Sequence, residues 1–170
     1  RWPKRMLEQI IPKVLAQGFN GLFLDTLDNA IELERIDARK YAGMKSAAAA
    51  LVRKIRSRYP ALKIMMNRGY DLLPHVERDI DMVLGESVFT SYDFNTRKYH
   101  RVRHDTYLSQ VRMLKEAQRR RPGLKVFTLD YWNPEDLAGI RRIYRTERSN
   151  SFNPYVATIN LDRIIPEPKP

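Results

Sequence analysis

The chain has 170 residues, of which 43% are hydrophobic and 30% are charged, as in a globular domain and unlike a disordered or collagenous chain. No apolar run approaches the ~20 residues of a membrane span, and the absence of cysteine excludes disulfides, thiolate nucleophiles and Cys-ligated zinc. The net charge of +11 (31 basic minus 20 acidic residues) raises nucleic acid or another polyanion as a partner.

The distribution of the charge favours a different interpretation. The basic residues form clusters within predicted helices and alternate with apolar positions, as on a solvated helix face, whereas several acids follow predicted strands. No aromatic stacking platform or nucleic-acid motif accompanies the charge. We therefore predict no nucleic-acid partner. The basic clusters are Arg53-Lys54-Arg56-Arg58, Arg119-Arg120-Arg121 and Arg141-Arg142-Arg145-Arg148.

Helical and strand patterns alternate from the start of the chain. Apolar pairs at a helical period predict a helix over residues 4–16, and Gly18 suits its C-terminal cap. Residues 21–25 form an apolar run typical of a buried strand. After a polar stretch, a second helix is predicted over 37–58 and a second strand over 62–67.

The middle of the chain contains its longest predicted loop. A short helical piece over 72–77 and a third strand over 82–86 come first. Residues 87–103 follow as an irregular stretch rich in Tyr, Phe, Asn and Asp, and loops of this length are usually functional or disordered. The aromatic content favours function. A helix over 105–120 comes next, with Leu108, Val111, Leu114 and Ala117 on one face.

The last part of the chain repeats the alternation. A fourth strand is predicted over 125–130, a helix over 134–147 that packs through Leu137, Ile140 and Tyr144, and a fifth strand over 155–159. We expect residues 1–165 to form one α/β domain and the proline-rich residues 166–170 to be a linker or frayed end.

This order calls for a parallel sheet with helical crossovers. Five strands opened by a helix match either the C-terminal five of a (β/α)8 barrel or a smaller open sheet. No leader segment precedes the first helix, so we expect a secretion signal to be absent or upstream.

Two acidic residues each close an apolar strand: Asp25 ends the first and Glu86 ends the third. The carboxyl ends of parallel strands form the mouth of such folds, where the chemistry takes place. Strand alternation gives Asp25 the same face as Phe23, and Glu86 the same face as Leu84. Two carboxyl groups, ~5 Å apart for retention or ~6.5–9.5 Å for inversion, are what hydrolysis of a glycosidic bond requires. The alternative is that each acid caps a helix or turn.

Two further polar triplets end strands. Asn67-Arg68-Gly69 could bind sugar hydroxyls or form a polar turn in which Gly69 takes an unusual backbone conformation. Asp130-Tyr131-Trp132 could hold a pyranose ring or belong to an aromatic core. His100 and His104 are four residues apart but lack a zinc signature, so no metal is predicted.

Three segments resemble a known family. Residues 18–28 read Gly-Phe-Asn-Gly-Leu-Phe-Leu-Asp-Thr-Leu-Asp, residues 66–70 Met-Asn-Arg-Gly-Tyr and residues 84–87 Leu-Gly-Glu-Ser. They are similar to glycoside hydrolase family 114, the endo-α-1,4-polygalactosaminidases, and to the hydrolase domains of bacterial Pel-type polysaccharide systems. The resemblance runs from about residue 6 to about residue 160.

The resemblance implies a (β/α)8 TIM barrel of which the chain carries strands four to eight, and which needs an N-terminal part outside this sequence. It implies endo-acting cleavage of α-1,4-linked galactosamine or N-acetylgalactosamine polymers, without cofactor, in a secreted or periplasmic setting. Asp25 would be the nucleophile or its electrostatic equivalent, and Glu86 the general acid and base. The substrate groove would be lined by Asp28, Asn67, Arg68, Tyr92, Asp93, Asp130 and Tyr131.

Two alternatives stay open. The same groove could bind a carbohydrate without cutting it, as in a pseudoenzyme. Less favoured is a basic protein that binds nucleic acid or another polyanion.

Overall fold

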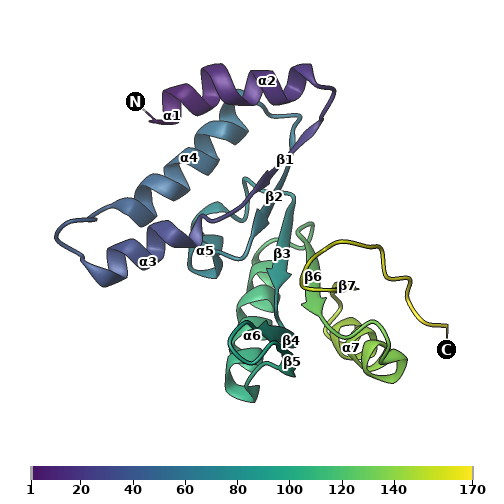
Figure 1. Ribbon diagram of the computed structural model, residues 1–170. Coiled ribbons are helices and arrows are strands. Elements are labelled where there is room, and N and C mark those ends of the chain that lie inside the picture. The colour runs from purple at the N-terminus through teal and green to yellow at the C-terminus, as the bar shows by residue number, and fades with distance from the viewer. Residues whose placement is uncertain (1, 170) are drawn as a thin grey trace. The chain divides into compact units, whose positions relative to one another are not determined.

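The structure is a computed structural model that describes residues 2–169, so the first residue of the predicted domain and the last residue of the predicted tail, Pro170, lie outside it. The chain forms two compact units, Arg1–Val83 and Leu84–Pro170. Helices and strands alternate in both (Figure 1).

Unit 1 begins with the predicted helix over residues 4–16, which is confirmed and contains a π-helical turn. Gly18 ends it in the left-handed region (φ +91°), as predicted for a helix cap. The elements of the unit are α1 (Trp2–Arg5), η1 (Met6–Ile10), α2 (Ile11–Ala16), β1 (Gly21–Leu24), α3 (Asp28–Ile36), α4 (Met44–Arg58), β2 (Lys63–Asn67), η2 (Tyr70–Leu72) and α5 (Leu73–Val76).

The prediction of one helix over residues 37–58 is wrong in its first part, because α4 begins only at Met44 and a separate helix, α3, occupies the preceding polar stretch. The Asp37 carboxylate accepts hydrogen bonds from the backbone N–H groups of Arg39 and Lys40, which forms a turn. Gly43 then takes a left-handed conformation (φ +82°) immediately before α4. Local side-chain bonding therefore outweighs the helical pattern here.

Strands β1 and β2 are parallel, with register running from Gly21 opposite Lys63 to Leu24 opposite Met66. A side chain at position 21 would lie 2.9 Å from the Lys63 carbonyl oxygen, so this close approach requires glycine. The prediction of a buried first strand is wrong at Phe23, which is 53% exposed. Among the described residues β1 hydrogen-bonds with β2 alone, so one side of the strand has no neighbouring strand to cover it.

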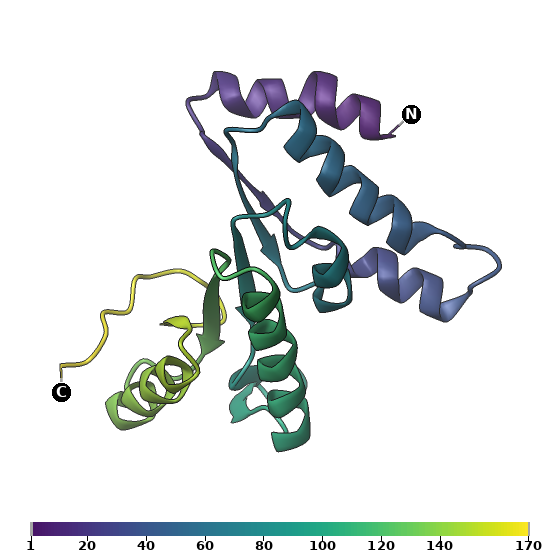
Figure 2. The ribbon, with the colours of Figure 1, turned by 180° about the vertical axis from the view of Figure 1, so that it is seen from behind.

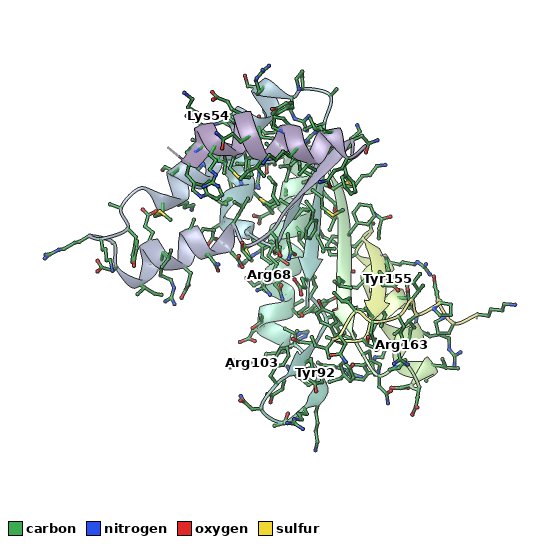
Figure 3. The ribbon with its side chains drawn as sticks, turned by 45° about the horizontal axis from the view of Figure 1, so that its top comes forward. Lys54, Arg68, Tyr92, Arg103, Tyr155 and Arg163 are labelled. Atoms are coloured by element: carbon green, nitrogen blue, oxygen red, sulfur yellow. The ribbon has the colours of Figure 1, made fainter. Side chains whose placement is uncertain are left out.

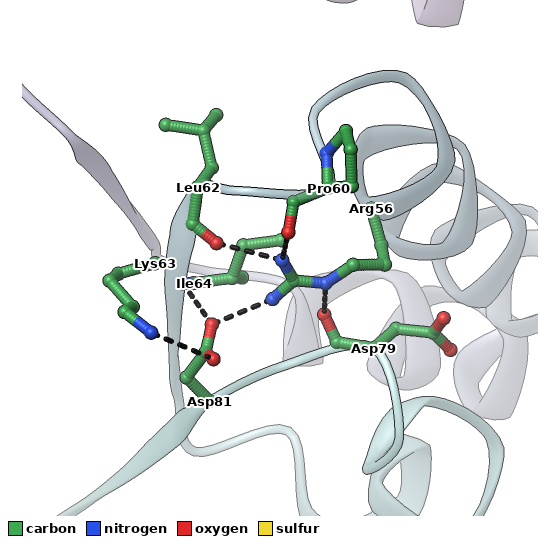
Figure 4. A network of polar contacts seen from close by, with 7 residues as sticks. All are labelled: Arg56, Pro60, Leu62, Lys63, Ile64, Asp79 and Asp81. Atoms are coloured by element: carbon green, nitrogen blue, oxygen red, sulfur yellow. Dashed lines mark hydrogen bonds and ion pairs between the residues drawn. The ribbon is translucent and has the colours of Figure 1, made fainter.

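A polar network ties α4 to the start of β2 (Figure 4). Arg56 donates to the carbonyl oxygens of Asp79, Pro60 and Leu62, each at 2.8 Å, and to the Asp81 carboxylate at 2.6 Å. Asp81 also accepts from the Ile64 N–H at 2.9 Å. The network therefore fixes the N-terminal end of β2.

Unit 2 contains most of β3 (Met82–Glu86), which crosses the boundary between the units. Four more strands follow, of which β4 and β5 form a hairpin, and the two long helices α6 and α7 alternate with β6 and β7 (Figure 2). Strands β6 and β7 are parallel, with Phe127 opposite Asn153 and Tyr131 opposite Ala157. Its other elements are β4 (Thr90–Asp93), β5 (Lys98–Arg101), α6 (His104–Arg120), β6 (Lys125–Tyr131), α7 (Leu137–Ser149) and β7 (Asn153–Ala157).

The prediction of an irregular segment over residues 87–103 is wrong, because β4 and β5 form an antiparallel hairpin there. Asp93 closes its turn by accepting from the N–H groups of Asn95 and Thr96 and from the Thr96 hydroxyl. Arg97 takes the positive φ (+55°) that lets the chain reverse. The turn depends on a short-range Asp motif, which the periodicity of apolar residues does not reveal.

The predicted packing faces of α6 and α7 are confirmed except at Leu108 and Leu137, each 51% exposed. Both lie in the first part of their helices, before the buried stretch. The tail is irregular, and Glu167 accepts two hydrogen bonds from Arg148 of α7. The buried apolar residues of the two helices are Val111, Leu114, Ala117, Ile140, Ile143 and Tyr144.

Candidate active site

The first candidate acid, Asp25, directly follows β1 and has an exposed side chain. Continuing the β1–β2 register by one position brings Asp25 opposite Asn67, the last residue of β2. The Asn67 amide donates to Asp25 Oδ1 at 3.0 Å, and the Thr26 N–H donates to the same oxygen at 2.8 Å. Asn67 is itself only 7% exposed. Unit 1 therefore presents a carboxylate to solvent and orients it with a buried amide.

Asp28 and Arg68 form a second pair in unit 1. Asp28 is the first residue of α3, and its Oδ2 lies 4.0 Å from Arg68 Nε. Both side chains are close to half exposed (Figure 3 labels Arg68). Arg68 and Gly69 have positive φ angles of +49° and +60°, so the predicted unusual conformation of Gly69 is confirmed and extends to Arg68. The triplet is thus a polar turn that still presents its guanidinium to solvent.

The second candidate acid, Glu86, ends β3 and is half-buried. The Tyr131 hydroxyl, at the end of β6, donates to Glu86 Oε1 at 2.6 Å. The next residue, Ser87, has φ +55°, and its N–H donates to the Leu129 carbonyl oxygen at 2.8 Å. Both the side chain and the backbone at this strand end are therefore held by β6. Tyr131 is only 4% exposed, so it serves as a partner of Glu86 more than as a wall of a groove.

Asp130 lies in the protein interior and not at the surface, where a residue that lines a groove would lie. Its side chain is fully buried and accepts from the N–H groups of Phe89 and Thr90 at 2.8 and 2.7 Å and from the Thr90 hydroxyl at 3.3 Å. Burial raises the pKa of Asp130 to about 6, against the lowering effect of these hydrogen bonds. The prediction of a substrate contact is wrong here. Strand alternation points Asp130 to the face opposite Tyr131, where it anchors the segment that follows Glu86.

Asp130 has an acidic neighbour that was not predicted from the sequence. Glu147 of α7 is fully buried, and neither of its carboxylate oxygens has a hydrogen-bond partner among residues 2–169. Burial and then the charge of Asp130 raise the pKa of Glu147 to about 8. Glu147 therefore carries a proton at neutral pH. Glu147 lies seven residues after Ile140 and three after Tyr144, so helical spacing places it on the packing face of α7, and this spacing was a usable signal.

Of the two hairpin residues predicted to bind substrate, only Tyr92 presents a surface for it. Tyr92, which Figure 3 labels, is half-buried. Its ring contacts those of Tyr99 and Phe94 edge to face, with centroids 5.0 and 5.2 Å away. The carboxylate of Asp93 is occupied by the turn, and the Thr96 hydroxyl and the two N–H groups hold its pKa below the usual range. Asp93 thus shapes the hairpin, and its predicted role in binding is not supported by its contacts.

The sequence predicted that Trp132, with Asp130 and Tyr131, holds a pyranose ring or joins an aromatic core, whereas it predicted no role for Tyr99. The rings of Tyr99 and Trp132 lie 6.3 Å apart, beside a shallow hollow of about 390 Å³. Trp132 directly follows the strand end Asp130-Tyr131, and Tyr99 belongs to β5, in the segment predicted to be irregular. The hollow is lined by Arg97, Lys98, Tyr99, Trp132, Asn133 and Asp136.

Within residues 2–169, no group of three or more His, Cys, Asp or Glu side chains is placed to hold a metal ion. In the same residues, no helix combines the length and the apolar character that crossing a bilayer demands.

The solved structures that the chain resembles include two of one glycoside hydrolase domain. The chain matches the glycoside hydrolase domain of PelA from Pseudomonas aeruginosa with a TM-score of 0.81 and 29% identity, over 95% of this chain and 62% of that chain. It matches a variant of that domain, with one glutamate replaced by alanine, with a TM-score of 0.80 and 28% identity, over the same shares. The chain thus spans less than two thirds of that domain. No curated protein matches it.

The likeness confirms the predicted fold class: the chain carries the C-terminal five strands of a (β/α)8 barrel. The family model for glycoside-hydrolase family GH114 matches residues 1–168, almost the whole sequence. On this match, and in agreement with the resemblance of its strand-end motifs, the chain belongs to glycoside-hydrolase family GH114.

Proposed function

We propose that this protein is an endo-acting glycoside hydrolase that cleaves an α-1,4-linked galactosamine or N-acetylgalactosamine polysaccharide with two carboxyl groups. Asp25 acts as the nucleophile or electrostatic stabiliser, and Glu86 acts as the general acid and base. The observation that carries the proposal is the 2.6 Å hydrogen bond from Tyr131 to Glu86, because it fixes a half-buried carboxyl group at a strand end, where barrel enzymes place their chemistry.

The chemistry assigns each acid a different task. Glu86 gives a proton to the glycosidic oxygen while the bond from that oxygen to the anomeric carbon breaks. Positive charge then develops on the anomeric carbon, and the Asp25 carboxylate stabilises it, either as an ion pair or by forming a bond. Glu86 next accepts a proton from the water that replaces the leaving sugar, which restores both groups.

The contacts of the two acids suit this division. Asp25 is exposed and held by the Asn67 amide, so it stays reachable while its orientation is fixed. Glu86 is half-buried and the Tyr131 hydroxyl fixes its position, which suits a group that exchanges a proton with one glycosidic oxygen. Asp28 and Arg68 offer a carboxylate and a guanidinium to sugar hydroxyl and amino groups.

The substrate and the compartment are inferred from the family and from the PelA domain that the chain resembles. We place the protein outside the cytoplasm, secreted or in the periplasm, where it would meet such a polymer. Signal-peptide mapping of the full-length protein, together with fractionation of cells that express it, would test the location.

The decisive test of the function replaces Glu86 by Gln in the full-length protein and measures release of oligosaccharides from the polymer. We expect turnover to fall by about 10²–10⁴-fold, because an amide cannot donate the proton. Glu8→Gln, which changes an exposed glutamate on the first helix, is the matched control and should leave turnover unchanged. Turnover in Glu86→Gln equal to that of the wild type would exclude the assignment. Polymer binding without any product from the wild type would indicate the pseudoenzyme instead.

A further inference from the structure

We propose that Trp132 and Tyr99 form a stacking platform for an uncharged pyranose ring of the polysaccharide. The proposal rests on the function proposed above and adds a binding subsite to it. All of its residues belong to unit 2.

The platform consists of two aromatic rings from separate strands. Trp132 follows β6, and its backbone N–H donates to the Ala157 carbonyl oxygen at 3.0 Å. Tyr99 belongs to β5, and its hydroxyl accepts from the Ile159 N–H at 3.3 Å. The ring centroids are 6.3 Å apart with an interplanar angle of 46°, so the faces diverge and are not sealed against each other. Both side chains are half-buried.

The Trp132 ring is held in one orientation. Its Nε1–H donates to Asp136 Oδ2 at 2.9 Å, while Asp136 Oδ1 accepts from the Gly139 N–H at 2.8 Å. A side chain at position 139 would overlap both Asp136 Oδ2 and Trp132 Nε1, so the arrangement requires glycine. Trp132 also packs against the core formed by Ile140, Ile143, Tyr144, Val156 and Ile165. A ring that is already fixed loses little entropy when a ligand stacks on it.

The hollow beside the rings has a suitable size and chemistry for one sugar. Its volume of about 390 Å³ falls within the range of small-molecule sites. An aromatic face offers apolar contact to the C–H face of a pyranose, and the Asn133 amide at the rim offers hydrogen bonds to hydroxyl groups.

Charge decides which ring fits. Arg97 and Lys98 contribute two positive charges to the lining, against one negative charge from Asp136, whose two oxygens already accept hydrogen bonds. Asp93 lies opposite Lys98 in the hairpin and keeps its negative charge, but it does not line the hollow. A protonated amino sugar would be repelled from this lining at short range, so the platform favours a ring whose nitrogen is acylated.

The test measures binding apart from cleavage. The parent is the full-length Glu86→Gln protein, and the ligands are α-1,4-linked N-acetylgalactosamine oligosaccharides of one length and their de-N-acetylated counterparts, titrated by calorimetry. We expect Trp132→Ala to raise Kd for the acetylated ligand about tenfold and Trp132→Phe about threefold. Trp2→Ala removes the other tryptophan, which is 63% exposed in unit 1, and should leave Kd unchanged.

A separate variant tests whether the positive lining disfavours a protonated amino sugar. The parent should bind the de-N-acetylated ligand more weakly, and the double substitution Arg97→Gln and Lys98→Gln should narrow that difference by at least about threefold. A parent that prefers the de-N-acetylated ligand would overturn the charge argument.

The outcomes separate the subsite from the function. If the wild type cleaves the polymer but both Trp132 variants bind like the parent, the platform is wrong and the function stands. If the wild type does not cleave but binding depends on Trp132, the function is wrong and the platform stands. A melting temperature for each variant identifies a loss of folding, and Trp132→Phe, which keeps a ring in the core, then decides the question.

Discussion

Two kinds of carboxylate differ clearly in this molecule. Asp81 and Asp130 accept hydrogen bonds from backbone N–H groups that are distant in the sequence, so they hold separate segments together. Asp25 and Glu86 follow or end strands and take a hydrogen bond from a side chain at the end of another strand. The first kind serves the framework, and the second is the kind to which we assign the proposed chemistry. For the acids of this barrel, the group that donates a hydrogen bond to each carboxylate therefore indicates the role of that acid better than the position of the acid in the sequence does.

The largest effect should come from Asp130→Ala. This change leaves the N–H groups of Phe89 and Thr90 buried without their acceptor, so the free energy of unfolding should fall by roughly 3–5 kcal/mol. Urea denaturation of the full-length protein measures it. Asp93→Ala is the control, because its hydrogen bonds lie in an exposed turn and its effect should be smaller. Equal stability of Asp130→Ala and the wild type would show that Asp130 does not belong to the framework.

Arg56→Ala should come next. Arg56 makes four hydrogen bonds at the N-terminal end of β2 and is 21% exposed. Burial tends to raise the pKa of its partner Asp81, but the Ile64 N–H, Arg56 and Lys63 together hold that pKa below the ordinary value. We expect the free energy of unfolding to fall by roughly 2–3 kcal/mol. Polymer turnover at a temperature where the variant is folded should stay within about twofold of wild type, in contrast to variants of Asp25. A loss of turnover as large as that of Glu86→Gln would remove the distinction between the two ends of β2.

The pH dependence of stability should reveal the buried pair Asp130 and Glu147. Their pKa values are raised in the folded protein to about 6 and about 8, so between about pH 5 and about pH 8 the folded state binds more protons than the unfolded state. The stabilisation that the two protonated carboxyl groups contribute is complete at low pH and is lost as the pH rises through these pKa values. The free energy of unfolding should therefore fall as the pH rises over this range.

Glu147→Gln should abolish most of that slope, because glutamine does not titrate. Chemical denaturation at a series of pH values gives the measurement. A stability that rises from pH 5 to pH 8 would contradict the assignment of Glu147 as protonated at neutral pH.

The smallest effect should be that of Tyr131→Phe. It removes the hydrogen bond to Glu86 but keeps the ring, so kcat for the polymer should fall about tenfold while KM and stability change little. Tyr155→Phe is a matched control, because its hydroxyl accepts from the Ile165 N–H away from Glu86. A fall in KM alone, with kcat unchanged, would argue against a role of Tyr131 in positioning Glu86.

Periodicity predicted the alternation of helices and strands and the ends of β1, β2 and β3, and therefore the positions of Asp25, Asn67 and Glu86. It failed where local bonding governs the backbone, as at Asp37 and in the hairpin turn at Asp93. The burial of Asp130 was unpredictable for another reason. The N–H groups that donate to Asp130 belong to Phe89 and Thr90, some forty residues away in the sequence, and only folding brings them next to the carboxylate.

The distinct roles of Asp25 and Glu86 can be tested with two substrates. The full-length Asp25→Asn and Glu86→Gln variants are assayed on the polymer and on an aryl glycoside of the same sugar whose leaving group needs no protonation. We predict that Glu86→Gln loses the polymer reaction but still releases the activated phenol, and that Asp25→Asn loses both. Equal losses of both reactions in the two variants, or polymer cleavage by Glu86→Gln at the wild-type rate, would contradict the account.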